Sequence, residues 1–402
     1  KAKLWLRKVR CFARASVVAS AKQLVLRTPF LRSMSSVVRA AFDVGSGACK
    51  LSVAEVERRN GQILDEIFWV HQPCLFGHDL KCSADGSLSE EIMERGFKIL
   101  AVFAAKSKEM GAEEFAGVAT AVFRKATNGQ AFIDRVRAEL GIPLSVVSQE
   151  EEGLLGFRTA VAASGLDHFG STMDAGDVVM WDSGGASFQI VAVVETQPED
   201  IYTTGYRQVA NSVSDLDVYL GPIGASNATA IMVEEIQGKS FRECQTANPA
   251  TIAQARELVT LLQAKMPPPE QWLVDAIHRA QVVCIGGDTS VFNIAKIALG
   301  RPSFGAETIW FALETLVGQS DEQLDERFPE AEMVIPKLVL VYSVMKHLGI
   351  TEVRYYPTNG SCHGLLSTPK YWPAEEEEEG GAHGGEQLPN DDEAHLGGPE
   401  SP

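Results

Sequence analysis

Two stretches of the sequence place an aspartate and a glycine-rich turn between apolar segments. The first is Phe42–Gly47 and the second is Trp181–Ser187, and a further apolar run follows each of them. A strand that ends at Asp-x-Gly brings a carboxylate next to several backbone N–H groups, and glycine allows a ligand to approach the backbone closely. Two such turns facing each other can bind phosphate groups through their amides and hold a divalent cation on the two aspartates, Asp43 and Asp182. The duplication therefore predicts a phosphate-binding site between two similar halves of the chain.

Three further segments carry side chains suited to phosphate chemistry. Glu150–Glu152 lies at the predicted start of a helix, where mutual repulsion would raise some of the three pKa values, as a general base requires. On spacing alone, a solvated helix N-terminus explains these acids more simply. Arg124 follows an apolar strand and can stabilise charge on a phosphoryl group or form a surface ion pair. Gly286–Thr289 follows a buried strand and can approach a ligand or cap a helix through Asp288.

An alternating series of strands and helices must position these residues. The first half is predicted to have strands at 41–45, 49–57 and 63–71, a helix at 90–110, a strand at 115–120, a helix at 129–140, a strand at 144–148 and a helix at 150–163. The second half repeats this order, with strands at 177–182, 187–195 and 200–205, then helices, a strand at 282–285, a helix from 288, a core helix at 333–345 and a strand at 353–356. Two such copies predict an α/β protein of two ribonuclease-H-like domains flanking a phosphate-binding cleft, the architecture of the actin-like ATPase superfamily.

The two ends of the chain differ in charge from its middle. Residues 1–40 contain ten Lys or Arg and no acid, whereas 374–402 contain ten Asp or Glu and no base. The basic start is typical of a mitochondrial or plastid transit peptide, and a cytoplasmic protein that begins at Met34 is the equal alternative. The acidic tail has too few apolar residues to fold. We expect a leader at 1–38, domains at 39–165 and 166–367, with the final helix packing back on the first domain, and a disordered tail at 368–402.

The composition argues against several other classes of protein. A net charge of −17 repels nucleic acid at long range, so nucleic acid is not an expected partner. No apolar run approaches the roughly 18 residues that cross a membrane, so a membrane is not an expected partner. The seven cysteines are scattered and include no Cys-x-x-Cys pair, which disfavours a disulfide framework and a zinc site.

Five segments resemble, in order, motifs of the exopolyphosphatase / guanosine-pentaphosphate phosphohydrolase (Ppx/GppA) family in its short, two-domain form. They correspond to a first phosphate loop, an Ala-Thr-x-x-x-Arg turn, a Ser-Gly-x-Glu-Glu-Ala box, a second phosphate loop and a third glycine-rich turn. Their positions here are Phe42–Gly47, Gly117–Arg124, Val147–Gly153, Asp182–Gln189 and Ile285–Thr289. The family usually has Asn in place of Gly47.

The resemblance implies a hydrolase that uses Mg²⁺ or Mn²⁺ to release the terminal phosphate of inorganic polyphosphate or a phosphorylated guanine nucleotide, with formation of a homodimer left open. Glu152 would act as the base, with Arg124 and Gln189 as the other catalytic residues. Asp43, Asp182 and Glu152 would be the metal ligands. The phosphate groups would contact residues of the three turns: Gly45, Ser46, Gly47, Gly184, Gly185, Ser187, Gly286 and Gly287.

Two positions of the second loop depart from the family pattern. Gln189 replaces a Glu, and Ala186 replaces a Gly. Glutamine removes one anionic ligand, although it can still orient a water molecule. A second hypothesis is therefore a sensor of the same fold that binds polyphosphate or nucleotide without turnover. A third, a small-molecule kinase of the actin-like superfamily, requires an adenosine pocket and an Asp base near an acceptor loop, and no segment matches either.

Overall fold

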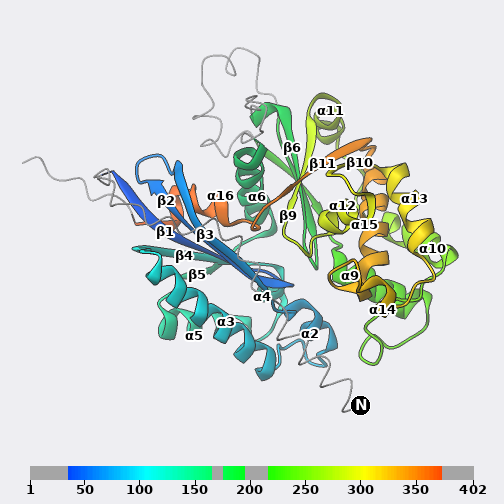
Figure 1. The fold of residues 1–402 in the computed structure, drawn as a ribbon, viewed down its shortest axis with the longest axis horizontal. Coiled ribbons are helices and arrows are strands. Elements are labelled where there is room, and N and C mark those ends of the chain that lie inside the picture. The colour runs from blue at the N-terminus through cyan, green and yellow to red at the C-terminus, as the bar shows by residue number, and fades with distance from the viewer. Residues whose placement is uncertain (1–34, 165–174, 195–215, 374–402) are drawn as a thin grey trace, which may run out of the picture.

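The computed structural model describes residues 35–164, 175–194 and 216–373, which form two α/β halves, each built on one mixed sheet (Figure 1). The predicted leader as far as residue 34, the strand predicted at 200–205 and the tail from residue 374 lie outside these ranges. None of the helices in the described part of the chain is both long enough and apolar enough to cross a lipid bilayer.

The first sheet has five strands in the order β3-β2-β1-β4-β5. Strands β1 and β2 are antiparallel, as are β2 and β3, whereas β4 and β5 run parallel to β1. All nine residues of β1 are buried because the sheet is covered on both faces at its centre. The strands are β1 (Ser36–Val44), β2 (Ala48–Glu57), β3 (Ile63–Pro73), β4 (Glu114–Ala119) and β5 (Leu144–Val146).

The second sheet repeats this topology. Its order is β10-β11-β9-β6-β7-β8, in which β6 and β7 form an antiparallel hairpin, β8 pairs antiparallel with β7, and β9 and β11 run parallel to β6. The strands are β6 (Val178–Ser183), β7 (Phe188–Val193), β8 (Leu216–Gly221), β9 (Gln281–Gly286), β10 (Ser303–Gly305) and β11 (Glu352–Pro357). The predicted duplication and the α/β fold class are confirmed, and the third strand of the second copy is found at β8.

Helices cover the outer face of each sheet. Over the first sheet, α3 and α5 cover a core that includes Phe42, Leu51 and Phe132. Over the second, α15 is almost entirely buried, as predicted for a core helix, and Pro336 lies in its first turn, where a missing N–H costs nothing. The helices are α2 (Phe76–Cys82), α3 (Glu90–Glu109), α4 (Ala121–Lys125), α5 (Gly129–Leu140), α9 (Ala225–Ile231), α10 (Ile252–Lys265), α11 (Gln271–Arg279), α12 (Val291–Leu299), α13 (Ala306–Leu316), α14 (Asp321–Leu324) and α15 (Val334–Leu348).

Two helices lie between the sheets, and each packs on the sheet of the other half (Figure 1). Helix α6 (Gln149–Ser164) follows the first sheet in sequence, yet its Phe157 and Val161 pack against β6, β7 and β9 of the second. Helix α16 (Cys362–Leu366) follows the second sheet, and its residues pack against β1, β2 and β4 of the first. This exchange ties the two halves together and carries α6 to the space between them.

The ordered region extends slightly beyond both predicted ends. Strand β1 begins at Ser36, before the predicted boundary at residue 39. At the other end, Trp372 is only 6% exposed and stacks on Arg39, so the chain is still packed after residue 368. Apolar burial of the Trp372 ring explains why this short segment is held against the first sheet.

Candidate active site

The first glycine-rich turn joins β1 to β2 directly after Asp43. The amide of Gly45 donates to the carbonyl of Ala48 at 3.0 Å and closes the turn. The carbonyl of Ser46 accepts from Gly77 at 2.8 Å, and that of Gly47 accepts from Cys74 at 3.0 Å. The carbonyls of the turn are therefore bonded to the segment around the start of α2.

The second turn is closed by the same type of bond as the first, but its bonded carbonyls lie one position earlier. The amide of Gly184 donates to the carbonyl of Ser187 at 2.9 Å, while the carbonyls of Gly184 and Gly185 accept from the first residues of α9, Ala225 and Ser226. Gly224 must be a glycine, since a Cβ there would lie 2.4 Å from the backbone of Gly185 and Ala186.

The two turns lie against each other. A Cβ built on Gly185 would be 3.5 Å from the Cβ of Ser46. A small cavity of about 10 Å³ beside them is lined by residues of both halves, including Ser46 and Ser226. The amides of Gly45 and Gly184 are used to close the turns. The next two amides are those of Ser46 and Gly47 in the first turn and of Gly185 and Ala186 in the second. Within the described ranges, none of these four amides donates a hydrogen bond. These four N–H groups can bind an anion.

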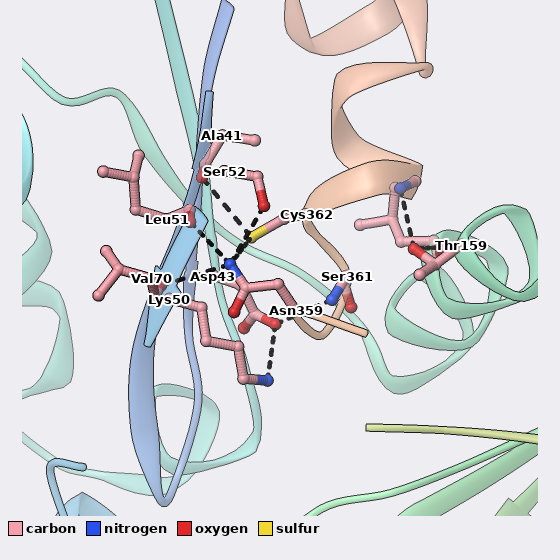
Figure 2. Close-up of polar contacts among 12 residues, drawn as sticks. Ala41, Asp43, Lys50, Leu51, Ser52, Val70, Thr159, Asn359, Ser361 and Cys362 are labelled. Atoms are coloured by element: carbon pink, nitrogen blue, oxygen red, sulfur yellow. Dashed lines mark hydrogen bonds and ion pairs between the residues drawn. The ribbon is translucent and has the colours of Figure 1, made fainter. Parts of the chain in front are cut away.

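Asp43 is 3% exposed and is anchored through one oxygen. Its Oδ2 accepts from the Lys50 ammonium at 3.1 Å and from the backbone N–H of Ser361 at 3.0 Å (Figure 2). Its Oδ1 is directed toward the first turn, since a Cβ on Gly45 would lie 3.9 Å from it. Oδ1 is therefore the oxygen that faces the candidate phosphate loop.

Lys50 is a site residue that the sequence analysis missed. It is the register partner of Asp43 in the β1–β2 hairpin. Burial opposes its charge, but Asp43 and Asp182 outweigh burial and raise the pKa of Lys50 above its usual value. Lys50 therefore keeps a positive charge, in contact with Asp43 and under the influence of Asp182. The hairpin register was the signal that could have identified it, because the residue seven positions after Asp43 must return opposite to it.

Asp182 is the last residue but one of β6, which leads into the second turn. Burial raises the pKa of Asp182 to about 6, Lys50 acts in the opposite direction, and the charge of Asp43 raises it further. The three groups thus interact electrostatically across the two halves.

Glu152 lies in the first turn of α6 and is held by Arg124 from α4. Both Nη1 and Nη2 of Arg124 are 3.1 Å from Oε2 of Glu152, and Nη1 also donates to the carbonyl of Val147 at 2.6 Å. The Glu152 side chain is 13% exposed. No residue in the described ranges donates to its Oε1. Arg124 is therefore in an ion pair with Glu152 that is largely shielded from solvent and not on the open surface, and its role toward a phosphoryl group stays a prediction.

The predicted origin of the Glu152 pKa shift is wrong. Burial raises the pKa of Glu152 to about 7, Arg124 opposes this, and the other charges that raise it are Asp182 and Asp43. Glu150 is exposed, and Glu151 bonds to Lys370 and Tyr371. Burial disfavours the charge of Glu151 too, but these two partners outweigh it and lower the pKa of that carboxyl. Repulsion within the trio is therefore not the cause.

Gln189 lies on β7 between the other site elements. It pairs in register with Asp182, and its side chain is 1% exposed, with Nε2 3.5 Å from Oγ of Ser187. A Cβ on Gly153 would lie 3.3 Å from that of Gln189, so the residue after Glu152 packs directly on it. The position where the family pattern has Glu is thus buried, opposite Asp182 in the hairpin and against the residue that follows Glu152.

The third glycine-rich turn follows β9. The carbonyl of Gly286 accepts from the Tyr355 hydroxyl at 2.8 Å and from the amide of Thr358 at 3.0 Å. Ser290 caps α12 by accepting from Asn293, so the alternative in which Asp288 is the cap is wrong. Asp288 is exposed and lies 3.8 Å from Nε2 of His71 on β3. The turn therefore faces the first half of the molecule.

The carboxylates fit a hard divalent cation such as Mg²⁺. No three His, Cys, Asp or Glu side chains within the described ranges are grouped closely enough to hold a metal alone. Mg²⁺ is commonly held by one or two carboxylates, with water and substrate phosphates as its other ligands. Asp43 and Asp182 match that description, whereas Glu152 is paired with Arg124, and its role as a ligand stays a prediction.

A family model matches the middle of the chain. Residues 76–209 match the model of the Ppx/GppA phosphatase family, and this segment includes Arg124, Glu152 and the second turn. A Ppx/GppA family member from Aquifex aeolicus has a similar structure, with a TM-score of 0.57, 20% identity, and coverage of 83% of this chain and 97% of that one.

Two other solved structures share the fold. An exopolyphosphatase from Cytophaga hutchinsonii gives a TM-score of 0.58 at 16% identity and covers 82% of this chain and 96% of that one. An exopolyphosphatase-like protein gives a TM-score of 0.61 at 17% identity and covers 83% of this chain and 97% of that one. The resemblance predicted from the sequence is confirmed. The chain matches the Ppx/GppA phosphatase family in sequence over residues 76–209 and has the fold of its solved members over most of its length.

Proposed function

We propose that this chain is a Mg²⁺-dependent phosphoanhydride hydrolase that releases the terminal phosphate of inorganic polyphosphate or of a guanosine pentaphosphate. The observation that carries the proposal is the convergence of two turns, each closed by the same amide-to-carbonyl bond, with Asp43, Asp182 and Glu152 from both halves of the molecule. The family match and the fold support the coarser assignment of a phosphatase acting on polyphosphate or nucleotide.

In this proposal, Glu152 accepts a proton from the attacking water. Arg124 bonds only to Oε2, so Oε1 is the oxygen that takes the proton. A pKa of about 7 suits a base that must be ionised yet able to accept a proton near neutral pH.

The charge of the phosphate chain is met by groups from both halves. The free amides of Ser46, Gly47, Gly185 and Ala186 bind phosphate oxygens, and Lys50 supplies a positive charge next to Asp43. Asp43 and Asp182 would hold Mg²⁺, which when bound would neutralise charge that develops on the phosphate oxygens.

A panel of substrates tests the proposal. We expect phosphate release from long-chain polyphosphate or guanosine pentaphosphate with a kcat/KM well above that for ATP, and loss of release when EDTA removes the cation. Preference for ATP together with transfer of phosphate to an acceptor would indicate a kinase and contradict the proposal.

Replacing Gln189 with Glu should raise turnover several-fold and lower the Mg²⁺ concentration needed for half-maximal rate. The buried position next to Asp182 would gain a carboxylate, and hard cations prefer charged oxygen ligands. The measurement is a Mg²⁺ titration of phosphate release for both forms. Superimposable curves would mean that residue 189 orients water and contributes nothing to the cation.

The same position favours a second candidate function, a sensor that binds polyphosphate or nucleotide without turnover. Gln189 removes a carboxylate from the innermost part of the site, and Ala186 adds a methyl group to the second turn. A native chain that binds polyphosphate but releases no phosphate, together with an active Gln189→Glu variant, would establish the sensor and reject the hydrolase.

A further inference from the structure

One segment far along the chain contacts three parts of the candidate site. Residues Thr358–Ser361, here called the crossing segment, run from the end of β11 to the start of α16. The amide of Thr358 donates to Gly286 in the third turn. The side-chain amide of Asn359 donates to the carbonyl of Leu51 at 2.7 Å and to the hydroxyl of Ser52 at 3.1 Å, which fixes the segment on β2 (Figure 2).

The crossing segment then bonds to Asp43. The backbone N–H of Ser361 donates to Oδ2 at 3.0 Å, on the same oxygen that Lys50 contacts. With Oδ2 occupied twice, Oδ1 remains directed at the first turn. These two bonds hold the plane of the carboxylate, so that one oxygen stays on Lys50 and Ser361 while the other faces the first turn.

Between these contacts, residue 360 is a glycine at a point where a side chain would collide with the site. Gly360 has φ +63°, and a Cβ there would lie 2.3 Å from Oδ2 of Asp43 and 2.3 Å from Nζ of Lys50. The nearest atoms in its way are thus the two charged groups of the site, with no backbone atom among them. An added methyl group can be accommodated only if the carboxylate or the ammonium moves.

The segment also connects to the helix that carries Glu152. The amide of Gly364, in the helix that follows the segment, donates to the hydroxyl of Thr159 at 2.9 Å, and a Cβ on Gly364 would lie 2.0 Å from the carbonyl of Leu155. α16 and α6 are therefore in direct backbone contact. The crossing segment and the helix after it thus join Asp43 to the helix that carries Glu152.

We propose that Gly360 and the backbone amide of Ser361 are positioning groups of this site. They hold Oδ2 of Asp43 and the Lys50 ammonium together, so that Oδ1 is presented to a cation at the first turn. The inference rests on the proposed function for the identity of the cation. It adds to that function a requirement for a segment more than 300 residues away in sequence from Asp43.

The test compares Gly360→Ala with Gly349→Ala. Gly349 has φ +72° at the C-terminal cap of α15, and a Cβ there meets nothing within 4 Å. Both variants carry the backbone strain of an alanine at positive φ, but only Gly360→Ala also collides with Asp43 and Lys50. Binding of Mn²⁺ alone is measured by the loss of its free EPR signal, together with the melting temperature and the kinetics of phosphate release.

We expect Gly360→Ala to weaken Mn²⁺ binding at least about tenfold and to lower kcat, the usual scale for removing a group that orients a ligand residue. Gly349→Ala should bind Mn²⁺ like the wild type, although its melting temperature should be similar to that of Gly360→Ala. If Gly360→Ala does not fold, Asn359→Ala loosens the segment without adding bulk and should weaken Mn²⁺ binding in the same direction. Unchanged Mn²⁺ binding in the folded variants, or no binding by the wild type, would overturn the positioning role.

Failure of this inference is distinguishable from failure of the proposed function. If the wild type binds Mn²⁺ but releases no phosphate, and Gly360→Ala binds Mn²⁺ more weakly, the hydrolase is rejected and the positioning role is supported. An active wild type whose Gly360→Ala and Gly349→Ala variants bind Mn²⁺ alike would reject only the positioning role.

Discussion

Replacing Glu152 with Gln should lower the rate of phosphate release by at least about 100-fold, the usual scale for loss of a general base. Glutamine keeps the shape of the side chain and an oxygen for Arg124, but it cannot take a proton from water. The pKa of Glu152 is raised mainly by burial, so a neutral side chain at this position relieves a cost of the folded state at neutral pH. We therefore expect a melting temperature, in metal-free buffer, no lower than that of the wild type.

The matched control for this variant is Glu150→Gln. Glu150 lies in the same helical turn, but its side chain is exposed. Its replacement makes the same chemical change, from a carboxyl group to an amide, and should leave kcat close to the wild-type value. A Glu152→Gln variant with near-normal turnover would remove this residue from the mechanism.

Replacing Asp182 with Asn should lower phosphate release on the order of 100-fold, comparable to removal of one group that stabilises charge in the transition state. Asp182 is a cleaner choice than Asp43, because Asp43 also anchors Lys50 and Ser361. Burial raises the pKa of Asp182, so its charge destabilises the metal-free folded state above the pKa of the unfolded chain. The amide should therefore maintain or raise the melting temperature in EDTA while activity falls.

A Mg²⁺ titration of Asp182→Asn shows whether its activity falls because a cation ligand is lost or because the fold is destabilised. If Asp182 holds the cation, the Asn variant should need several-fold more Mg²⁺ for half-maximal rate. A variant as unstable as it is inactive would instead show that Asp182 acts by maintaining the fold.

The sequence was sufficient to predict both hairpins of the site. The strand pattern and the Asp-x-Gly turns are local signals, and the structure places Asp43 and Asp182 in matching positions at the ends of β1 and β6. Local signals also located α6 and the strand β9 within a few residues. The duplicated topology followed because each half repeats the same order of elements.

The rest of the site depends on contacts that no local pattern records. Lys50 is a single lysine in an apolar strand, and only the hairpin register brings it to Asp43. Asn359 and Ser361 reach the site through the exchange of α6 and α16 between the halves, which could not be anticipated from spacing. The pKa of Glu152 was attributed to its sequence neighbours, because burial between two halves cannot be seen in a helix N-terminus alone.

The most direct test of the central claim is a ³¹P NMR time course of inorganic polyphosphate with the purified protein and Mg²⁺. We expect orthophosphate to appear from the start while the signal of internal phosphates declines, and we expect neither change in EDTA or with Glu152→Gln. Cleavage within the chain, which would produce short oligophosphates before orthophosphate, would contradict terminal hydrolysis. Absence of any orthophosphate from both polyphosphate and guanosine pentaphosphate would contradict the assignment of this site as a phosphoanhydride hydrolase.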